Sequence, residues 1–287
     1  MLKLAEWYGK RVVSYVLRPR VIVQERPVLL GSDNICEHPI FLIGVHRSGT
    51  SLVRRMFNSH SKIACPPETF YLEHYVRMLE DPVTFSGYEG FGYDREAMRA
   101  DIAATASRLH EAFRLTQGKE RWADKTPQYV WWTEGIDRLF GGRPYYVLIQ
   151  RHPYDIVFSL VARKWRFNDI EDLFTSNLTY VRDSVAKMNE FEAAHPDRCI
   201  RLRYETLTTN PTDELTRVLT FLGEQFEPGM LTFYEKSHNQ GLEDPMVLGT
   251  RGISGSHENW RSWTDAQKQE AAQILGETAK GLGYSIQ

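Results

Sequence analysis

A glycine-spaced loop between a short apolar run and a helical pattern constrains the fold of this chain more than any other feature. The run IFLIG, residues 40–44, is typical of a buried parallel strand, and residues 50–60, TSLVRRMFNSH, place apolar side chains on one helical face. The loop between them, GVHRSGTS, carries Gly44 and Gly49 at the spacing of a P-loop. A strand, a glycine loop and a helix in this order predict an anion site at the N-terminus of the helix.

The loop departs from the Walker pattern at the residue that determines its chemistry. Thr50 stands where the P-loop lysine belongs, and Arg47 supplies a cation inside the loop. The next expected strand ends in Gln150 and Arg151, without the acid that would hold magnesium in an ATP-dependent enzyme. The loop therefore indicates a phosphate-like ligand bound without a metal, although such a loop can also serve only to turn the chain. Its candidate contacts are Arg47, Ser48, Gly49, Thr50 and Ser51.

The same strand–helix unit recurs along the chain. YYVLIQ at 145–150 precedes the helical stretch IVFSLVARKW, and CIRLRY at 199–204 precedes TDELTRVLTFLG. Strands that alternate with helices predict a parallel sheet with right-handed crossovers. We therefore expect a P-loop-like α/β fold of three layers, in which helices flank a central parallel sheet. Ligands should bind at the carboxyl ends of the strands.

A second candidate anion site follows the second strand. Arg151 comes directly after that strand, and Ser159 lies eight residues later on the next helix. Two helical turns can bring the serine hydroxyl back beside the arginine, and such a pair binds anions well. The alternative is an ordinary ion pair between Arg151 and Asp155.

Two long segments lack a regular pattern. Residues 81–95, DPVTFSGYEGFGYDR, hold three glycines among aromatic side chains, and residues 236–257 hold four glycines and a proline. Long irregular segments in a compact domain are usually functional or disordered. For residues 81–95 we expect a mobile binding lid.

Composition excludes several classes of protein. The 287 residues carry a net charge of -2, which does not indicate nucleic-acid binding, and no run of about 18 apolar residues predicts a spanning helix. The spacing of the three cysteines, Cys36, Cys65 and Cys199, argues against a zinc site or a disulfide framework. We expect reduced, buried thiols in a cytoplasmic protein.

The N-terminal stretch has an amphipathic helical pattern. Residues 1–21 combine five Lys and Arg with one Glu and with apolar residues at roughly helical spacing. We expect a terminal helix that docks on its own domain, in preference to a peripheral membrane or partner-binding helix. The expected organisation is an N-terminal helical extension at 1–37 and one domain at 38–287.

Several motifs in order resemble those of the sulfotransferases that use 3′-phosphoadenosine 5′-phosphosulfate (PAPS). GVHRSGTSLVRRMF resembles their 5′-phosphosulfate loop, RHPYDIVFS their 3′-phosphate motif, RYETLTTNP the segment that places a tyrosine near the adenine, and TRGISG the late glycine loop. PPET and DKTP look like the branch that includes tyrosylprotein sulfotransferases and many bacterial members. The resemblance covers residues 38–284. The sequence departs from the family pattern at two places. Leu52 stands where many cytosolic members have a tryptophan, and three extra residues are inserted at 256–258.

The resemblance implies PAPS as the donor, no metal, and a hydroxyl or less commonly an amine as the acceptor group. The acceptor would belong to a small molecule, a glycan or a peptide, and an oligomer is compatible with the sequence. The alternatives are a P-loop-type small-molecule or nucleotide kinase and a non-catalytic nucleotide-binding protein. The donor-binding residues that the resemblance implies are Arg47, Ser48, Gly49, Thr50, Ser51, Arg151, Ser159, Tyr204, Arg251 and Gly252.

The resemblance also implies three catalytic residues. Glu68 in PPET matches the general base of the branch, Lys125 in DKTP its second catalytic cation, and Arg47 would neutralise charge on the leaving phosphate. Glu68 could instead cap the helix in TFYLEHYVRML, and Lys125 could be a surface lysine. Other candidates for the base are His46, His60, His74 and His152. Aromatic residues of 70–93, with Trp131, Trp132 and Trp165, are candidates for the wall of an acceptor pocket.

Overall fold

The computed structural model describes most of the chain from Cys36 onward. Of the expected N-terminal extension only Cys36 and Glu37 are described, so the prediction for residues 1–21 lies outside the described residues. The described ranges are 36–238, 241–244, 247, 249–253, 255 and 257–286.

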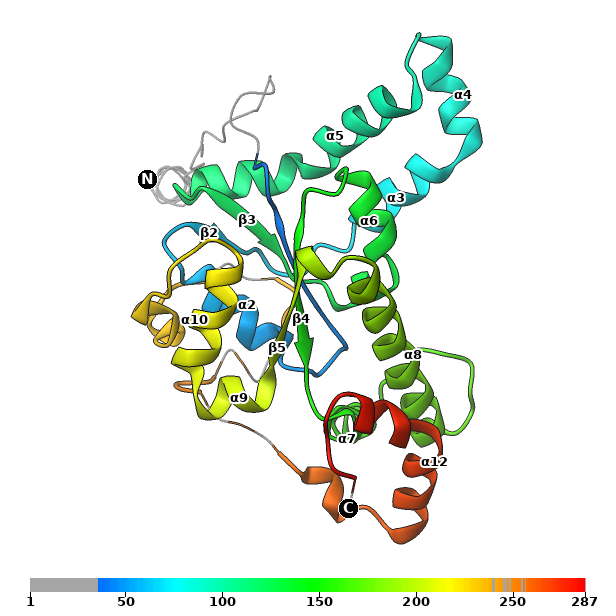
Figure 1. Ribbon diagram of the computed structural model, residues 1–287, viewed down its shortest axis with the longest axis vertical. Coiled ribbons are helices and arrows are strands. Elements are labelled where there is room, and N and C mark those ends of the chain that lie inside the picture. The colour runs from blue at the N-terminus through cyan, green and yellow to red at the C-terminus, as the bar shows by residue number, and fades with distance from the viewer. Residues whose placement is uncertain are drawn as a thin grey trace, which may run out of the picture.

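Five parallel strands form one sheet in the order β2-β3-β1-β4-β5 (Figure 1). The glycine loop follows the central strand β1, so it lies in the middle of the sheet edge. The parallel sheet predicted from the sequence is confirmed, and the three expected strands are β1, β4 and β5. The strands are β1 (Ile40–Gly44), β2 (Ile63–Ala64), β3 (Arg121–Asp124), β4 (Tyr145–Gln150) and β5 (Cys199–Arg203).

The strands are buried on both faces, because successive side chains point to opposite sides. In β1, Phe41 and Ile43 belong to one hydrophobic cluster, whereas Ile40 and Leu42 belong to the other. An all-parallel sheet needs apolar residues on both faces, since helices cover both. This requirement explains why IFLIG reads as an uninterrupted apolar run.

Helices cover both faces of the sheet, which confirms the expected three layers (Figure 1). Helices α2, α9 and α10 pack on one face, and α3, α5, α6, α7, α8 and α12 supply the cluster on the other. The bounds are α2 (Thr50–Asn58), α3 (Leu72–Glu80), α4 (Pro82–Gly90), α5 (Arg95–Thr116), α6 (Thr133–Leu139), α7 (Pro153–Ala162), α8 (Leu173–Ala194), α9 (Tyr204–Thr209), α10 (Pro211–Phe221) and α12 (Asp265–Gly281).

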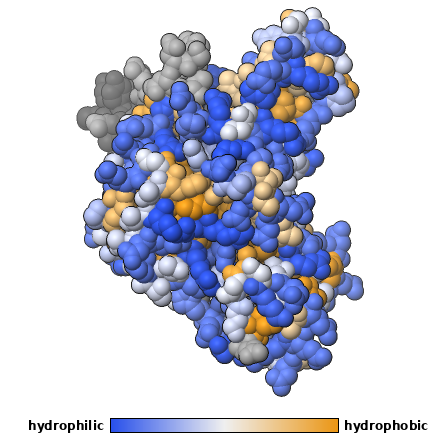
Figure 2. Space-filling view, in the orientation of Figure 1, coloured by the Kyte–Doolittle hydropathy of each residue, from blue (hydrophilic) through white to orange (hydrophobic). Residues whose placement is uncertain are grey.

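The expectation that residues 81–95 lack regular structure is wrong, and the mobile binding lid expected there stays a prediction. Most of this segment forms α4, which projects with the adjoining ends of α3 and α5 from the body of the protein (Figures 1 and 2). The Asp81 side chain accepts hydrogen bonds from the N–H groups of Val83 and Thr84, and Pro82 occupies the first turn. These start signals favour a helix despite the glycines, because they satisfy the exposed donors of its first turn.

The two loop glycines are required by close packing. A Cβ atom on Gly44 would lie 2.7 Å from the Ser48 hydroxyl and 3.1 Å from Ile149 Cβ on β4. Gly49 has φ +99°, and a Cβ atom there would lie 2.4 Å from the Tyr204 ring. The absence of side chains therefore lets α2 begin directly against β4 and α9.

The cysteine expectation is confirmed as far as burial is concerned. Cys36, Cys65 and Cys199 are buried free thiols. Burial raises the pKa of Cys65 and of Cys199 to about 12, so both stay protonated and unreactive near neutral pH.

Within the described ranges, none of the helices combines the length and the apolar character that a membrane span requires.

We predict that Gly49→Ala destabilises the protein and that Gly87→Ala does not. Alanine at position 49 must adopt a left-handed backbone, costing about 1–2 kcal/mol, and must also displace Tyr204. Gly87 lies in α4 with open space around its Cα, so alanine there should add roughly 0.5–1 kcal/mol to the free energy of unfolding. Urea unfolding of both variants measures this, and equal stabilities would contradict the packing explanation.

Candidate active site

Two adjoining cavities lie beside the glycine loop at the carboxyl ends of the strands. The first, of about 680 Å³, is lined by Glu68 and is here called the Glu68 cavity. The second, of about 580 Å³, is lined by Arg151 and is called the Arg151 cavity. Both are lined by residues of the loop and of one later segment, so they meet there. The shared lining residues are Arg47, Thr50, Ser51 and Asp244.

The loop presents Arg47 and the start of α2 to both cavities. Arg47 has φ +74°, a left-handed conformation, and its Nε donates to Ser159 Oγ at 3.0 Å. The Ser48 N–H donates to the Val45 carbonyl and closes the turn. This N–H therefore does not point at a ligand, contrary to the expectation. The N–H groups of the first turn of α2, beginning at Thr50, have no acceptor within the helix, which is the arrangement that favours an anion at a helix N-terminus.

Residues of α2, α7, α9 and the segment after Asp244 line the Arg151 cavity, together with Arg151 itself. The Arg151 guanidinium donates to the Arg47 carbonyl at 2.7 Å and stacks on the Tyr204 ring at 4.6 Å. Ser159 and Gly252 line the same cavity. The structure thus brings the residues predicted from the two anion motifs together at one edge of the sheet. Arg251 is exposed and is not among the residues that line this cavity.

Glu68 and Lys125 form an ion pair at the wall of the Glu68 cavity. Lys125 Nζ donates to Glu68 Oε1, and it also lies 3.4 Å from Ser51 Oγ. Burial raises the pKa of Glu68 above its ordinary value, and this effect outweighs the opposing effect of Lys125. A carboxylate with a raised pKa accepts a proton more readily, as a general base requires.

Both alternatives for this pair are wrong. Helix α3 begins at Leu72 with Tyr71 at its N-cap, so Glu68 precedes the helix and does not cap it. Lys125 is fully buried and is therefore no surface lysine. Glu68 lines its cavity, and the buried Lys125 lies against it.

A buried network behind Lys125 positions the segment that carries Glu68. Asp124 accepts from Thr69 Oγ1 at 2.6 Å and from Thr126 Oγ1 at 2.8 Å, and His110 Nε2 lies 2.8 Å from it. These contacts tie residues from three separate elements to the end of β3. Sequence analysis could not find this network, because nothing in the local pattern connects Thr69 or His110 to Asp124.

Among the four candidate histidines, only His46 lines either cavity. Burial, reinforced by Lys125 and Arg47, lowers the pKa of His46 to about 4, so the ring is neutral at pH 7. His46 Nδ1 lies 2.7 Å from the Tyr180 hydroxyl, and its ring stacks on Phe167 at 4.7 Å. The remaining three contribute to neither cavity lining: His60 contacts the Gln225 carbonyl, His74 is exposed on α3, and His152 caps α7.

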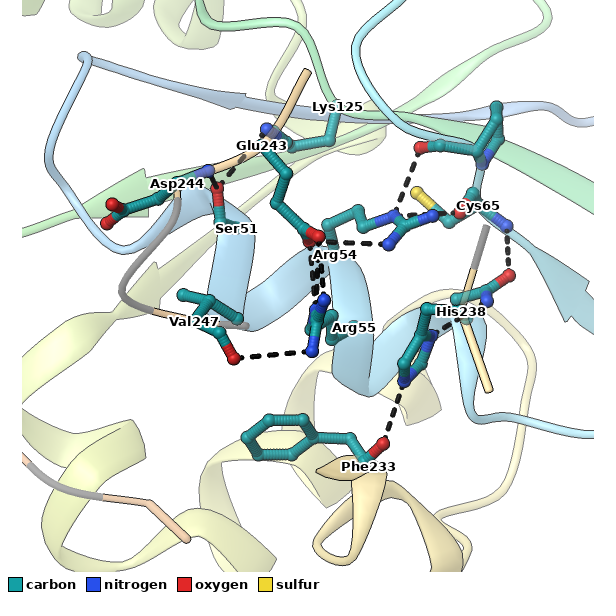
Figure 3. A network of polar contacts seen from close by, with 12 residues as sticks. Ser51, Arg54, Arg55, Cys65, Lys125, Phe233, His238, Glu243, Asp244 and Val247 are labelled. Atoms are coloured by element: carbon teal, nitrogen blue, oxygen red, sulfur yellow. Dashed lines mark hydrogen bonds and ion pairs between the residues drawn. The ribbon is translucent and has the colours of Figure 1, made fainter. Parts of the chain in front are cut away.

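Sequence analysis missed two acidic residues next to the site, Glu243 and Asp244; Figure 3 shows Glu243 against Arg54 and Arg55 and the Asp244 N–H at Ser51. Asp244 forms ion pairs with Arg47 at 2.5 Å and with Arg163 at 3.2 Å, and its N–H donates to Ser51 Oγ. Glu243 forms ion pairs with Arg54 and Arg55 of α2. The segment 241–244 is thereby fastened across the start of α2, between the two cavities.

Aromatic side chains line one wall of the Glu68 cavity. Trp165 and Phe167 both line it, whereas no aromatic residue of 70–93 does. Phe167 also stacks on Tyr180 at 4.2 Å. Trp165 was among the expected wall residues, and Phe167 was not, because the irregular segment after α7 carries no periodic signal.

Comparisons with known proteins agree with this geometry. A model of the sulfotransferase family matches residues 39–228. A protein from Caenorhabditis briggsae named as a protein-tyrosine sulfotransferase is 27% identical over 86% of this chain and 89% of its own length.

Solved structures share the fold at lower sequence identity. The sulfotransferase domain from the curacin biosynthetic pathway has a TM-score of 0.65 at 22% identity, covering 86% of this chain and 98% of that domain. A mouse sulfotransferase complexed with PAP has a TM-score of 0.50 at 12% identity, covering 87% of this chain and 90% of the mouse chain.

We predict that Glu243→Gln destabilises the protein by about 3–5 kcal/mol, because it leaves two buried guanidinium groups without a counter-charge. The Glu243 side chain is 3% exposed and contacts Arg54 and Arg55. The matched control is Glu277→Gln. The exposed Glu277 carboxylate pairs with Lys280, so this substitution should change the free energy of unfolding by no more than about 0.5 kcal/mol. Similar unfolding midpoints for the two variants would show that Glu243 does not anchor its segment.

Proposed function

The chain belongs to the sulfotransferase family, and from this premise we propose that it transfers a sulfuryl group from PAPS to a hydroxyl of a small molecule. One observation carries the proposal: a cavity lined by cations and hydroxyls adjoins a cavity lined by a carboxylate, and they meet at Arg47 and the start of α2. Group transfer needs this arrangement, because donor and acceptor must meet in line.

The residues of the Arg151 cavity fit a doubly anionic nucleotide. Its lining includes three arginines, Arg47, Arg151 and Arg163, together with the hydroxyl groups of Ser51 and Ser159. Arginine and hydroxyl donors suit phosphate oxygens. When bound, PAPS would supply a sulfuryl group activated by its link to a phosphate. We propose that Arg47 and the α2 N-terminus hold the 5′ end and that Arg151 and Ser159 hold the 3′-phosphate.

Tyr204 and the late glycine segment would complete the donor site. The Tyr204 ring lies under Arg151 and against Gly49, at the edge of the cavity where an adenine could stack. Gly252 lines the same cavity. We retain Arg251 as a proposed contact from the motif alone, since its side chain is exposed.

The Glu68 cavity would hold the acceptor. Glu68 takes the proton of the acceptor hydroxyl as the oxygen forms its bond to sulfur and the bond from sulfur to the phosphate oxygen breaks. The products are a sulfate ester, protonated Glu68 and 3′-phosphoadenosine 5′-phosphate (PAP). Arg47 and Lys125 stabilise the negative charge that builds on the leaving oxygen, because their positions next to the α2 N-terminus are fixed before reaction.

A small acceptor is the partner that the cavity supports best. Its volume of about 680 Å³ lies in the range typical of small-molecule sites. A glycan or peptide acceptor is the alternative, and the relative named above is a protein-tyrosine sulfotransferase. The cytoplasmic location expected from the cysteines stays a prediction, as do an oligomer and the absence of nucleic-acid binding. A transfer screen with radiolabelled PAPS against pooled metabolites would identify the acceptor.

We predict that PAP binds at least about tenfold more tightly than ADP or ATP and needs no magnesium. Each charge-assisted contact to a 3′-phosphate contributes roughly 1.5–3 kcal/mol, and neither ADP nor ATP carries that group. Calorimetry with each nucleotide, with magnesium and with chelator, measures the difference. Tighter binding of ATP, or binding that strictly requires magnesium, would instead support a kinase.

We predict that Glu68→Gln lowers single-turnover transfer by about 10²–10⁴-fold, because the amide cannot accept the proton. Affinity for PAP should change little. The wild-type rate should fall as pH decreases through the raised pKa of Glu68, so its acid limb lies above the ordinary glutamate range and disappears in the variant.

Glu73→Gln is the matched control, because Glu73 lies on α3 outside both cavity linings. If Glu68→Gln transferred sulfate at the wild-type rate, Glu68 would not be the base, and His46 would be the next residue to test. Until the acceptor is known, slow hydrolysis of PAPS by water can serve as the measured reaction.

A further inference from the structure

The segment after α7 forms a cationic and aromatic rim of the Glu68 cavity. Residues 163–167 read RKWRF, and all of them except Arg163 line this cavity. Trp165 and Phe167 keep 40% and 37% of their surface exposed, which is high for such large apolar side chains. Exposed aromatic surface beside charged groups is typical of a ligand site.

Two of the cations that line this cavity have no carboxylate within ion-pair distance among the described residues, whereas its carboxylates are already paired. Each of its carboxylates already has a cationic partner: Glu68 pairs with Lys125, Glu243 with Arg54 and Arg55, and Asp244 with Arg47 and Arg163. Lys164 and Arg166, in contrast, make no ion pair at contact distance with any carboxylate of the described residues, although Arg166 contributes, after hydrogen bonds from Thr175, to the lowered pKa of Asp172. Arg166 instead donates to the Glu171 carbonyl at 2.6 Å, which orients its guanidinium.

Lys164 occupies a backbone position that glycine would fill at lower cost. The N–H of Trp165 donates to the Leu160 carbonyl and that of Lys164 to the Val161 carbonyl, the hydrogen-bond pattern of a Schellman motif at the end of α7. Lys164 has φ +57°, which an L-residue with a side chain adopts only under strain. Strained residues of this kind gather at ligand-binding sites, and here the lysine side chain stands at the cavity rim.

We propose that Lys164 and Arg166 bind a negatively charged group of the acceptor. The acceptor would then be a small aromatic or otherwise apolar alcohol that carries a carboxylate, phosphate or sulfate. Its hydroxyl would lie at Glu68, its apolar body against Trp165 and Phe167, and its anionic group at the rim. This inference rests on the proposed function, because it takes the Glu68 cavity as the acceptor site.

The test compares three ligands that share one phenol ring and differ in charge. They are 4-hydroxyphenylacetate, its neutral amide, and the cation tyramine. Each is titrated into the full-length protein saturated with PAP, with calorimetry and tryptophan fluorescence as readouts. We expect the carboxylate to bind at least about tenfold more tightly than the amide, as for one charge-assisted contact, and tyramine to bind most weakly.

Two variants and one control separate this role from a structural one. Lys164→Gly removes the cation and relieves the left-handed strain, so it should lower the preference for the carboxylate while the melting temperature stays the same or rises. Arg166→Ala should lower the same preference. Lys280→Ala removes an equal charge from the exposed end of α12, outside both cavity linings, and should leave the preference intact.

Several results would overturn the inference. One is equal binding of the three ligands, or binding of none of them, by a protein that binds PAP. Another is binding of an acidic tyrosine peptide without binding of the small carboxylate. An unchanged preference in Lys164→Gly would also overturn it. In all these cases the proposed sulfotransferase activity would stand, whereas a protein that fails to bind PAP would contradict the proposed function itself.

Discussion

Close approach of the glycine loop to its neighbours is the constraint on which the rest of the site depends. Gly44 leaves no room for a side chain between β1 and β4, and Gly49 leaves none beneath Tyr204. Helix α2 therefore begins at the centre of the sheet edge, beside the residues that follow β4 and β5. Arg151 and Tyr204 reach this point because parallel strands end on the same edge. Two cavities can then share one helix N-terminus, which a bulkier loop would prevent.

Acidic residues balance the buried cations of the site in the structure described here. Asp244 lies against Arg47, Glu243 against Arg54 and Arg55, and Glu68 against Lys125. Removing a charge from water is costly unless a partner compensates, so these pairs allow a strongly basic site to fold without a ligand. If the proposed function is right, an anionic donor competes with Asp244 for Arg47. The affinity for the donor then depends on the difference in free energy between the pair of Arg47 with Asp244 and the pair of Arg47 with the donor. The segment 241–244, which carries Asp244, would have to move when the donor binds.

Local patterns were enough to predict a parallel sheet, three of its five strands and the glycine loop at its edge, whereas the short β2 and β3 were not predicted. The bounds of β1 and β4 agree with the apolar runs, because strands buried on both faces leave a continuous signal. Long-range pairs could not be predicted: Glu243 is 189 residues from Arg54, and no pattern in either stretch marks the contact. The helix α4 was not predicted because the three glycines of 81–95 disfavour a helix. The helix-start signal of Asp81 and Pro82 is stronger than this local preference.

The central claim is that one sheet edge binds the two ends of a single nucleotide next to Glu68. A crystal structure of the protein with PAP tests it most directly. The account predicts the 5′-phosphate at the N–H groups that begin α2, the 3′-phosphate at Arg151 and Ser159, and the adenine at Tyr204, with Asp244 moved from Arg47. A nucleotide bound in the Glu68 cavity, or with its 3′-phosphate directed away from Arg151, would contradict it.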